Sequence, residues 1–256
     1  MAIIIKTEKE IEALREGGKR LGTILQKVAQ KVAPGVSTME LNDYAEKLIR
    51  EGGDEPAFLN YKPYGASSPY PASLCVSVNN EIVHGIPKKN HILKEGDVVS
   101  IDLGLKHKGT FTDHALTVPV GKISKSAEKL LSVCQEALAA GIFEARAGNR
   151  IGDISFAIES VIKPHKYGIV RELAGHGVGR EIHEDPYVPN FGKKGTGAVL
   201  QKGMVIAIEP MINEGGKDVV LASDDWTFKT KDGTKSAHFE HTILITDGEP
   251  EILTQS

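Results

Sequence analysis

DVVSIDLGLKHKGTFTDHALTVPVG, residues 97–121, consists of two apolar stretches that flank a short polar segment, and this pattern predicts a β-hairpin. An aspartate stands on each side of the turn, Asp102 and Asp113. With His107 and Lys108 as the centre of the turn, the two aspartates are predicted to pair directly across the strands, with Cβ atoms roughly 5 Å apart. Two carboxylates so placed repel, so one is neutral unless a cation lies between them.

Two further acidic residues interrupt apolar strand patterns. Glu209 lies within VIAIEPMI (residues 205–212) and Glu240 within HFEHTILI (residues 238–245). Few lysines or arginines accompany these segments, and an unpaired charge is costly to bury. Four clustered carboxylates would destabilise the fold, whereas two divalent cations would balance their charge. We therefore predict a dinuclear metal site, although a solvated hairpin face is the alternative for the two aspartates taken alone.

The glycine-rich segment GHGVGREIHEDP, residues 175–186, supplies a histidine for this site. Its glycines let the backbone approach closely and leave the imidazole of His176 exposed, so we predict that His176 is a metal ligand. A structural histidine would be the better interpretation if His176 stood without the four acids. One imidazole with four carboxylates makes a mostly oxygen site, which suits Mn, Fe(II), Co or Zn.

Two other histidines occupy similar short turns that end in proline. They are His84 in HGIP and His183 in HEDP. The seven positions between His176 and His183 do not fit the helical HExxH pair of zinc peptidases, so we do not assign both to metal. We predict instead that His84 and His183 hydrogen-bond the substrate or donate a proton, with loop histidines in contact with water as an equally consistent interpretation.

Capping boxes predict two helices near the start of the chain. Thr7 with Glu10 and Ser37 with Glu40 each precede apolar residues at helical spacing. Strand patterns follow as far as residue 121, and helical patterns recur around residues 130–138 and 154–161 before strands return.

The order of helices and strands therefore occurs twice along the chain. The two halves also resemble each other in sequence, as in the segments EGDVVSIDLG (95–104) and KGMVIAIEPM (202–211). We predict a single α+β domain over residues 1–256, with pseudo-symmetric halves at about 7–121 and 124–250. Chance similarity between two α+β halves is the alternative.

Composition excludes several classes of partner. The formal net charge of −3 arises from 31 basic and 34 acidic residues spread along 256 positions, so no nucleic-acid or membrane partner is expected. The apolar start is too short for a signal peptide, and no apolar run approaches the ~20 residues of a membrane span. Two cysteines without paired spacing favour a reducing compartment. We therefore predict a cytoplasmic protein.

Five separated motifs together closely resemble the type 1 methionine aminopeptidases. In chain order they are EIVHGIP, SIDLG with TDHA, GHGVGREIHEDP, AIEPMI and HFEHT. The resemblance implies the α+β pita-bread fold, in which two pseudo-symmetric halves of antiparallel sheet are covered by helices. It also implies the metal ligands Asp102, Asp113, His176, Glu209 and Glu240, the same set that the charge argument selects.

The resemblance implies hydrolytic removal of the initiator methionine from nascent chains whose second residue is small. Two divalent ions (Mn, Co, Fe or Zn) would activate a water molecule, with Glu209 as both ligand and acid/base. His183 would contact the carbonyl oxygen and His84 the scissile amide. The partners would be nascent N-termini near the ribosome, and a monomer is expected. Because Met1 precedes the small Ala2, the mature protein is itself expected to begin at Ala2.

The resemblance also implies a pocket for the methionine side chain. Its walls would be formed by Tyr70, Cys75 and Trp226, with Phe58 and Tyr61 beside them. Without the resemblance, ordinary core packing is the better explanation for these aromatic residues. The segment NYKPYGASSPYP (60–71) is longer than in the common bacterial form, and Ile182 stands where an aromatic pocket residue is often found.

Two rival functions use the same residues. A proline-specific peptidase of this fold usually carries a large additional N-terminal domain, for which 256 residues leave no room. A metal-free protein that binds peptides in the same cleft is expected to lack one or more of the metal ligands, and none is missing here.

Overall fold

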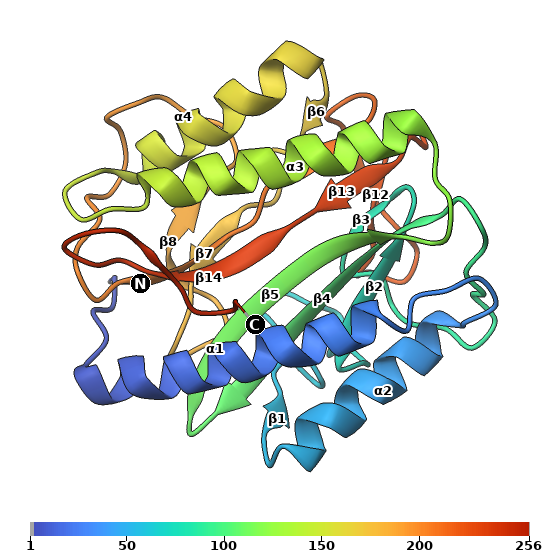
Figure 1. The fold of residues 1–256 in the computed structure, drawn as a ribbon, viewed down its shortest axis with the longest axis horizontal. Coiled ribbons are helices and arrows are strands. Elements are labelled where there is room, and N and C mark those ends of the chain that lie inside the picture. Colours follow the sequence, from blue (N-terminus) through green and yellow to red (C-terminus); the bar gives the residue numbers. More distant parts are fainter. Residues whose placement is uncertain (1–2, 256) are drawn as a thin grey trace.

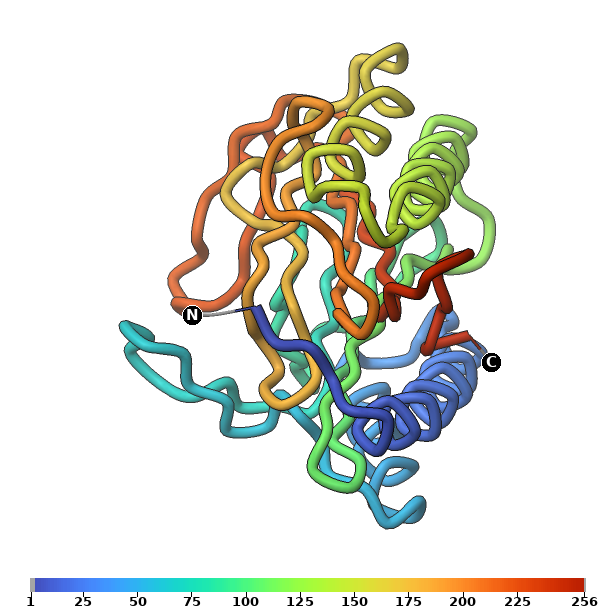
Figure 2. The backbone as a smooth tube through the Cα atoms, turned by 90° about the vertical axis from the view of Figure 1, so that its left-hand side faces the viewer, coloured from blue at the N-terminus to red at the C-terminus, as the bar shows by residue number. Residues whose placement is uncertain are grey.

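One large antiparallel sheet carries four helices on one face in a computed structural model, which describes residues 3–255 (Figures 1 and 2). The Met1–Ala2 terminus, and with it the expectation that the mature chain begins at Ala2, lies outside the described residues. The helices are α1 (Glu8–Ala29), α2 (Thr38–Glu51), α3 (Lys125–Glu144) and α4 (Ile151–Ile162), and a short 3₁₀ turn, η1 (Lys163–His165), follows α4. None of the helices within residues 3–255 combines the length and apolar character needed to cross a membrane.

The predicted capping boxes begin the first two helices. Thr7 Oγ1 accepts a hydrogen bond from Glu10 N at 3.3 Å, and the Glu10 carboxylate accepts one from Thr7 N at 2.7 Å. Ser37 and Glu40 repeat the arrangement at the start of α2. Each box satisfies backbone donors that have no partner inside the helix, so these two predictions are confirmed.

The large sheet runs in the order β1-β4-β5-β14-β9-β7-β8, with β2 also paired to β4 and β15 to β14. Its strands are β1 (Glu55–Pro56), β2 (Leu74–Val78), β4 (Val98–His107), β5 (Thr110–Pro119), β7 (Gly175–Gly177), β8 (Glu184–Val188), β9 (Val205–Ile208), β14 (Glu240–Leu244) and β15 (Glu251–Ile252). Two three-stranded sheets complete the fold. They consist of β13 (Ser236–His238), β10 (Met211–Asn213) and β6 (Gly168–Ile169), and of β11 (Val219–Leu221), β12 (Phe228–Thr230) and β3 (Glu81–Val83).

The turn of the central hairpin lies one residue later than the sequence predicted. His107 pairs with Thr110, so the turn centre is Lys108–Gly109 and not His107–Lys108. Both central residues have positive φ, 49° and 83°. A two-residue turn that matches the twist of its strands requires positive φ at both positions, and the glycine adopts this conformation without strain.

The shifted turn changes how the two aspartates of the hairpin face each other. Asp102 pairs with Ala115, and Asp113 pairs with Gly104, so the predicted direct pairing of Asp102 with Asp113 is wrong. The two residues are diagonal neighbours. They still share one face of the sheet, because positions two apart along a strand point to the same side.

The segment 203–212, predicted as one strand, is divided between two sheets. It forms β9 in the large sheet and β10 in a small one, with Glu209 and Pro210 between them. Pro210 has no N–H to donate to a strand partner, which explains the break. Glu209 therefore lies at the end of β9 and not within a strand.

Replacing Gly109 with alanine is expected to lower the free energy of unfolding by about 1–2 kcal/mol, because a Cβ is strained in the left-handed region. Urea denaturation measures the change. Gly248→Ala is the matched control, since φ there is not positive and an added Cβ meets no atom within 4 Å. Equal losses in the two variants would contradict the turn assignment.

Candidate metal centre

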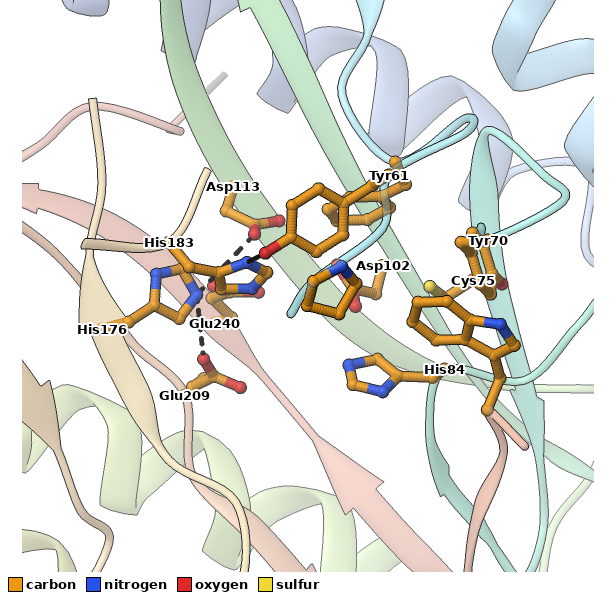
Figure 3. A pocket seen from close by; sticks show the side chains of 13 residues that line it. Tyr61, Tyr70, Cys75, His84, Asp102, Asp113, His176, His183, Glu209 and Glu240 are labelled. Carbon is orange, nitrogen blue, oxygen red and sulfur yellow. Dashed lines mark hydrogen bonds and ion pairs between the residues drawn. The ribbon is translucent and has the colours of Figure 1, made fainter. Parts of the chain in front are cut away.

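Every residue that the sequence proposed as ligand, catalytic group or pocket wall lines one cavity of about 340 Å³ (Figure 3). Ile182 was singled out at the methionine pocket, but it does not line the cavity. Pro63 lines it too, although no sequence pattern singled out this proline. The lining residues are Phe58, Tyr61, Pro63, Tyr70, Cys75, His84, Asp102, Asp113, His176, His183, Glu209, Trp226 and Glu240.

The candidate ligands come from five strands that are neighbours in the large sheet. In the order β4, β5, β14, β9 and β7, each strand contributes one residue, at or directly beyond its end in the case of β9. Side chains from adjacent strands lie about 5 Å apart, so this order gathers them at one place. The contributors are Asp102, Asp113, Glu240, Glu209 and His176.

Three of these side chains are close enough to share a metal ion. One ligand atom from each of Asp113, His176 and Glu240 lies within 4.8 Å of the others, and this is the one such group found among residues 3–255. His176 Nε2 also lies 3.4 Å from Glu209 Oε1 and 3.9 Å from Asp113 Oδ2. In Figure 3 the His176 ring points toward the Glu209 carboxylate, and a dashed line joins the two side chains.

The acids of this centre are buried without compensating cations. Asp102, Asp113 and Glu240 are 8%, 3% and 2% exposed, and the Glu209 side chain is 12% exposed. Among the described residues no lysine or arginine forms an ion pair with any of them; the nearest basic groups are the imidazoles of His176 and His238. Such burial is unfavourable for an ionised carboxylate.

Burial raises the pKa of each carboxyl group, and repulsion from acidic neighbours adds to the shift at three of the four. Burial raises the pKa of Asp113 to about 7. Burial, together with the negative charge of its acidic neighbours, raises the pKa of Asp102, Glu209 and Glu240 well above the usual range. Burial lowers the pKa of His176 to about 4, which favours the neutral imidazole that metal ions bind.

Two carboxylate oxygens at the centre have no hydrogen-bond partner. They are Asp102 Oδ1 and Glu240 Oε1, both fully buried. Buried oxygens of native proteins are rarely left unpaired, and an ion is one of the few explanations for such atoms. The donor set of four carboxylates and one imidazole fits a divalent metal such as Mn, Fe(II), Co or Zn.

His183 and His84 approach the cavity from different elements. His183 precedes β8, and its Nδ1 shares a hydrogen bond with the Tyr61 hydroxyl at 2.8 Å. Its ring centroid lies 4.4 Å from that of His176. His84 follows β3 with a positive φ of 58°, a strained conformation of the kind that gathers at functional sites.

Aromatic residues form the apolar end of the cavity. The Tyr70 hydroxyl donates to Gly85 O at 2.9 Å, and its ring lies edge-on to Trp226 with centroids 5.2 Å apart. Cys75 and Phe58 are buried in the same hydrophobic cluster, in which Ile182 packs behind the cavity wall. The pocket therefore joins an apolar end to the acidic centre.

His238, for which no sequence pattern predicted a role, also contacts the centre. His238 Nε2 lies 3.4 Å from Glu209 Oε2, and the side chain is nearly fully buried. The signal was present in the motif HFEHT, because His238 ends β13 two residues before Glu240 begins β14. The contact can be recognised only in the structure, where the break in the strand at Pro210 places Glu209 beside His238.

Comparison with known proteins agrees with this geometry. Residues 12–247 match the model of metallopeptidase family M24. The methionine aminopeptidase of Aquifex aeolicus is 46% identical over 259 aligned residues, covering 100% of both chains. The crystal structure of methionine aminopeptidase from Thermotoga maritima superposes with a TM-score of 0.95 at 42% identity, covering 100% of both chains. The pita-bread fold expected from the resemblance is therefore confirmed.

A prolidase from Pyrococcus horikoshii is a more distant neighbour. It superposes with a TM-score of 0.76 at 25% identity, and the match covers 99% of this chain but only 64% of the prolidase. The remaining part of that chain has no counterpart here, which agrees with the expectation that proline-specific enzymes of this fold are larger.

Adding Mn²⁺ to chelator-treated protein is expected to raise the melting temperature, because binding to the native state adds about 2.7 kcal/mol of stability at a hundredfold excess over Kd. Differential scanning calorimetry measures the shift. Asp113→Asn should reduce it strongly, whereas Asp247→Asn, at an exposed surface ion pair, should leave it unchanged. An equal shift in both variants would show that Mn²⁺ binds elsewhere.

Proposed function

The chain belongs to metallopeptidase family M24 and removes the initiator methionine from proteins, and we propose that this reaction occurs at the acidic centre on strands β4, β5, β14, β9 and β7. The observation that carries the proposal is that four neighbouring strands each bring one acid to a shared, buried position with no lysine or arginine beside it. An arrangement so unfavourable in isolation is expected where a bound cation stabilises it.

We propose two divalent ions, held by Asp102, Asp113, His176, Glu209 and Glu240. Two doubly charged ions balance the four carboxylates, and the two unpaired oxygens of Asp102 and Glu240 supply further ligand atoms. When bound, such a pair of ions supplies an acidified water and an electrostatic stabiliser for the developing oxyanion. Mn, Co, Fe and Zn all suit the donor set.

Glu209 is proposed as the acid/base group. Its carboxylate is the most exposed of the four acids, and its two oxygens lie 3.4 Å from His176 and from His238. The burial that raises its pKa makes it a better base than a free carboxylate, so it can take a proton from water and return it to the leaving amine.

His183 and His84 are proposed to contact the substrate. Burial lowers the pKa of His84 to about 4, so its imidazole is neutral at pH 7 and can donate one hydrogen bond. We propose that His183 donates to the carbonyl oxygen of the scissile bond and that His84 contacts the amide nitrogen. Donors aimed at a developing oxyanion are worth about a hundredfold or more in rate.

The apolar end of the cavity is proposed to bind the methionine side chain. Tyr70, Cys75 and Trp226 form its walls, with Phe58 and Tyr61 at the margin. A flexible thioether packs well against aromatic edges, which suits the edge-on pair of Tyr70 and Trp226. This pocket lies beside the acidic centre, so the amino group of a bound methionine would reach the metal ions.

The whole chain is proposed to act as one metallo-aminopeptidase domain with pseudo-symmetric halves at about 7–121 and 124–250. In support, α1 packs on β4 and β5, while α3 packs on β9, β10 and β13 (Figure 1). We further propose that it acts as a cytoplasmic monomer on nascent N-termini near the ribosome. Two free, buried cysteines agree with a reducing compartment.

Chromogenic Met-Ala and Xaa-Pro peptides test the proposed specificity. With added Mn, Co or Fe, hydrolysis of the Met-Ala peptide is expected and hydrolysis of the Xaa-Pro peptide is not, while chelator should abolish turnover. Turnover of the Xaa-Pro peptide would favour a proline-specific enzyme. No turnover of either peptide with any metal would favour a peptide-binding protein.

Glu209→Gln tests the proposed acid/base role and the proposed ligand role together. The amide cannot accept the proton, so kcat is expected to fall at least about 100-fold. Metal content is measured in parallel by elemental analysis and is expected to fall as well, because a ligand charge is lost. Glu249→Gln, at an exposed surface position, is the matched control. A variant with unchanged kcat and full metal content would refute both roles.

A further inference from the structure

The residues that precede helix α1 lie against the loop that connects His176 to His183. Figure 2 shows the dark blue start of the chain running alongside the yellow-orange hairpin of β7 and β8. Lys6 Nζ donates to Glu184 Oε2 at 2.6 Å, and the two side chains are only 1% and 3% exposed. Among the described residues, no other lysine–carboxylate pair is buried as deeply. Burial lowers the pKa of Lys6, and the Glu184 carboxylate opposes that shift.

The second oxygen of Glu184 organises the loop itself. Glu184 Oε1 accepts hydrogen bonds from Arg180 N at 2.6 Å and from Glu181 N at 3.0 Å. Both donors lie in the loop between β7 and β8, and Glu184 also pairs with Gly177 at the end of β7. The carboxylate therefore closes the loop from inside, and three donors, including the lysine, satisfy its charge.

The lysine side chain also packs directly on the loop backbone. A Cβ on Gly179 would lie 2.2 Å from Lys6 Cε, so only glycine allows this approach. Gly179 O in turn accepts from Phe111 N at 2.7 Å, two residues before Asp113 on β5. Lys6 N donates to Gly203 O at 2.8 Å, which fixes the backbone of the N-terminal segment. The loop is thus held between the N-terminal segment and the central hairpin.

His183 depends on this arrangement because it directly precedes Glu184. Its Nδ1 shares a hydrogen bond with the Tyr61 hydroxyl, and the two ring centroids lie 5.1 Å apart. The backbone of His183 is joined directly to Glu184, whose carboxylate holds the loop through three hydrogen bonds. A nearby surface pair, Arg180 with Glu10, adds little, since both side chains are substantially exposed.

We propose that the buried Lys6–Glu184 ion pair is a positioning device that fixes His183 at the cavity, so that the segment before α1 supports catalysis without touching the substrate. This rests on the proposed role of His183 in the reaction. A purely apolar contact could stabilise the loop equally well, but a buried pair imposes defined directions on its hydrogen bonds. Small displacements of a catalytic group are costly in rate, which gives that precision a purpose.

The test is a double-mutant cycle between Lys6→Met and His183→Ala, measured as kcat and KM on the Met-Ala peptide. Lys6→Met is expected to lower kcat on the order of tenfold with little change in KM or in Mn²⁺ affinity. In the His183→Ala background, whose residual activity is measured in the same assay, Lys6→Met should change kcat by less than about twofold. Lys202→Met, at an exposed surface ion pair, is the control and should change neither kcat nor KM.

A merely structural role for the pair predicts a different pattern. Under that role the fall in kcat would be the same in both backgrounds; that result, or an unchanged kcat in Lys6→Met alone, overturns the proposal. If Lys6→Met does not fold, Lys6→Met/Glu184→Gln removes both charges and keeps an acceptor for Arg180 N and Glu181 N, and the same expectations apply. If the wild-type chain does not hydrolyse the peptide with any metal, the proposed function itself is refuted. If the wild type is active but the effects of Lys6→Met and His183→Ala on kcat are additive, only the positioning role is refuted.

Discussion

Repulsion among the buried acids of the central sheet is the constraint on which the rest of the structure depends. Asp102, Asp113, Glu240 and Glu209 are placed together by backbone hydrogen bonds between neighbouring strands, so they cannot move apart without breaking the sheet. The sheet resists their separation, and burial prevents water from screening them. A stable native state therefore requires either protonation of these groups or bound cations. At neutral pH the second solution also creates a reactive centre.

The sequence predicted this centre because charge and periodicity are local signals. Capping boxes at Thr7 and Ser37, and acids within apolar strand patterns, can be identified without knowing the fold. The exact register of the central hairpin could not be identified in this way, because it depends on whether Lys108–Gly109 or His107–Lys108 forms the turn. Both choices keep Asp102 and Asp113 on one face, so the prediction that the two aspartates share a site did not depend on the exact pairing. A register shifted by a single position in one strand would have separated them.

Features that depend on contacts between distant segments were beyond the sequence argument. The contact of His238 with Glu209 depends on a break at Pro210 that places Glu209 beyond the end of its strand. Ile182 directly precedes His183, yet it is buried in the hydrophobic cluster that contains Phe58, Tyr70 and Cys75 and does not line the cavity. Pro63 lines the cavity from the segment 60–71, and the length of that segment did not predict where its backbone runs. In each case the position of the residue depends on contacts between segments far apart in the sequence, and hydrophobic periodicity does not predict such contacts.

The two kinds of group at the site differ in how rigidly they are held, and this difference explains the buried ion pair at Lys6. The candidate metal ligands lie on or at the ends of strands, where neighbouring ladders fix the backbone on both sides. His183 lies on a loop, so a strand ladder cannot supply the same precision. Glu184 begins β8, and its carboxylate adds three directed hydrogen bonds to the strand pairing that starts there, one of them from a lysine that is anchored by its own backbone. When a loop residue must act on an atom that the sheet positions, the loop has to be held in a defined place relative to the sheet. Hydrogen bonds such as those of Glu184 provide that connection.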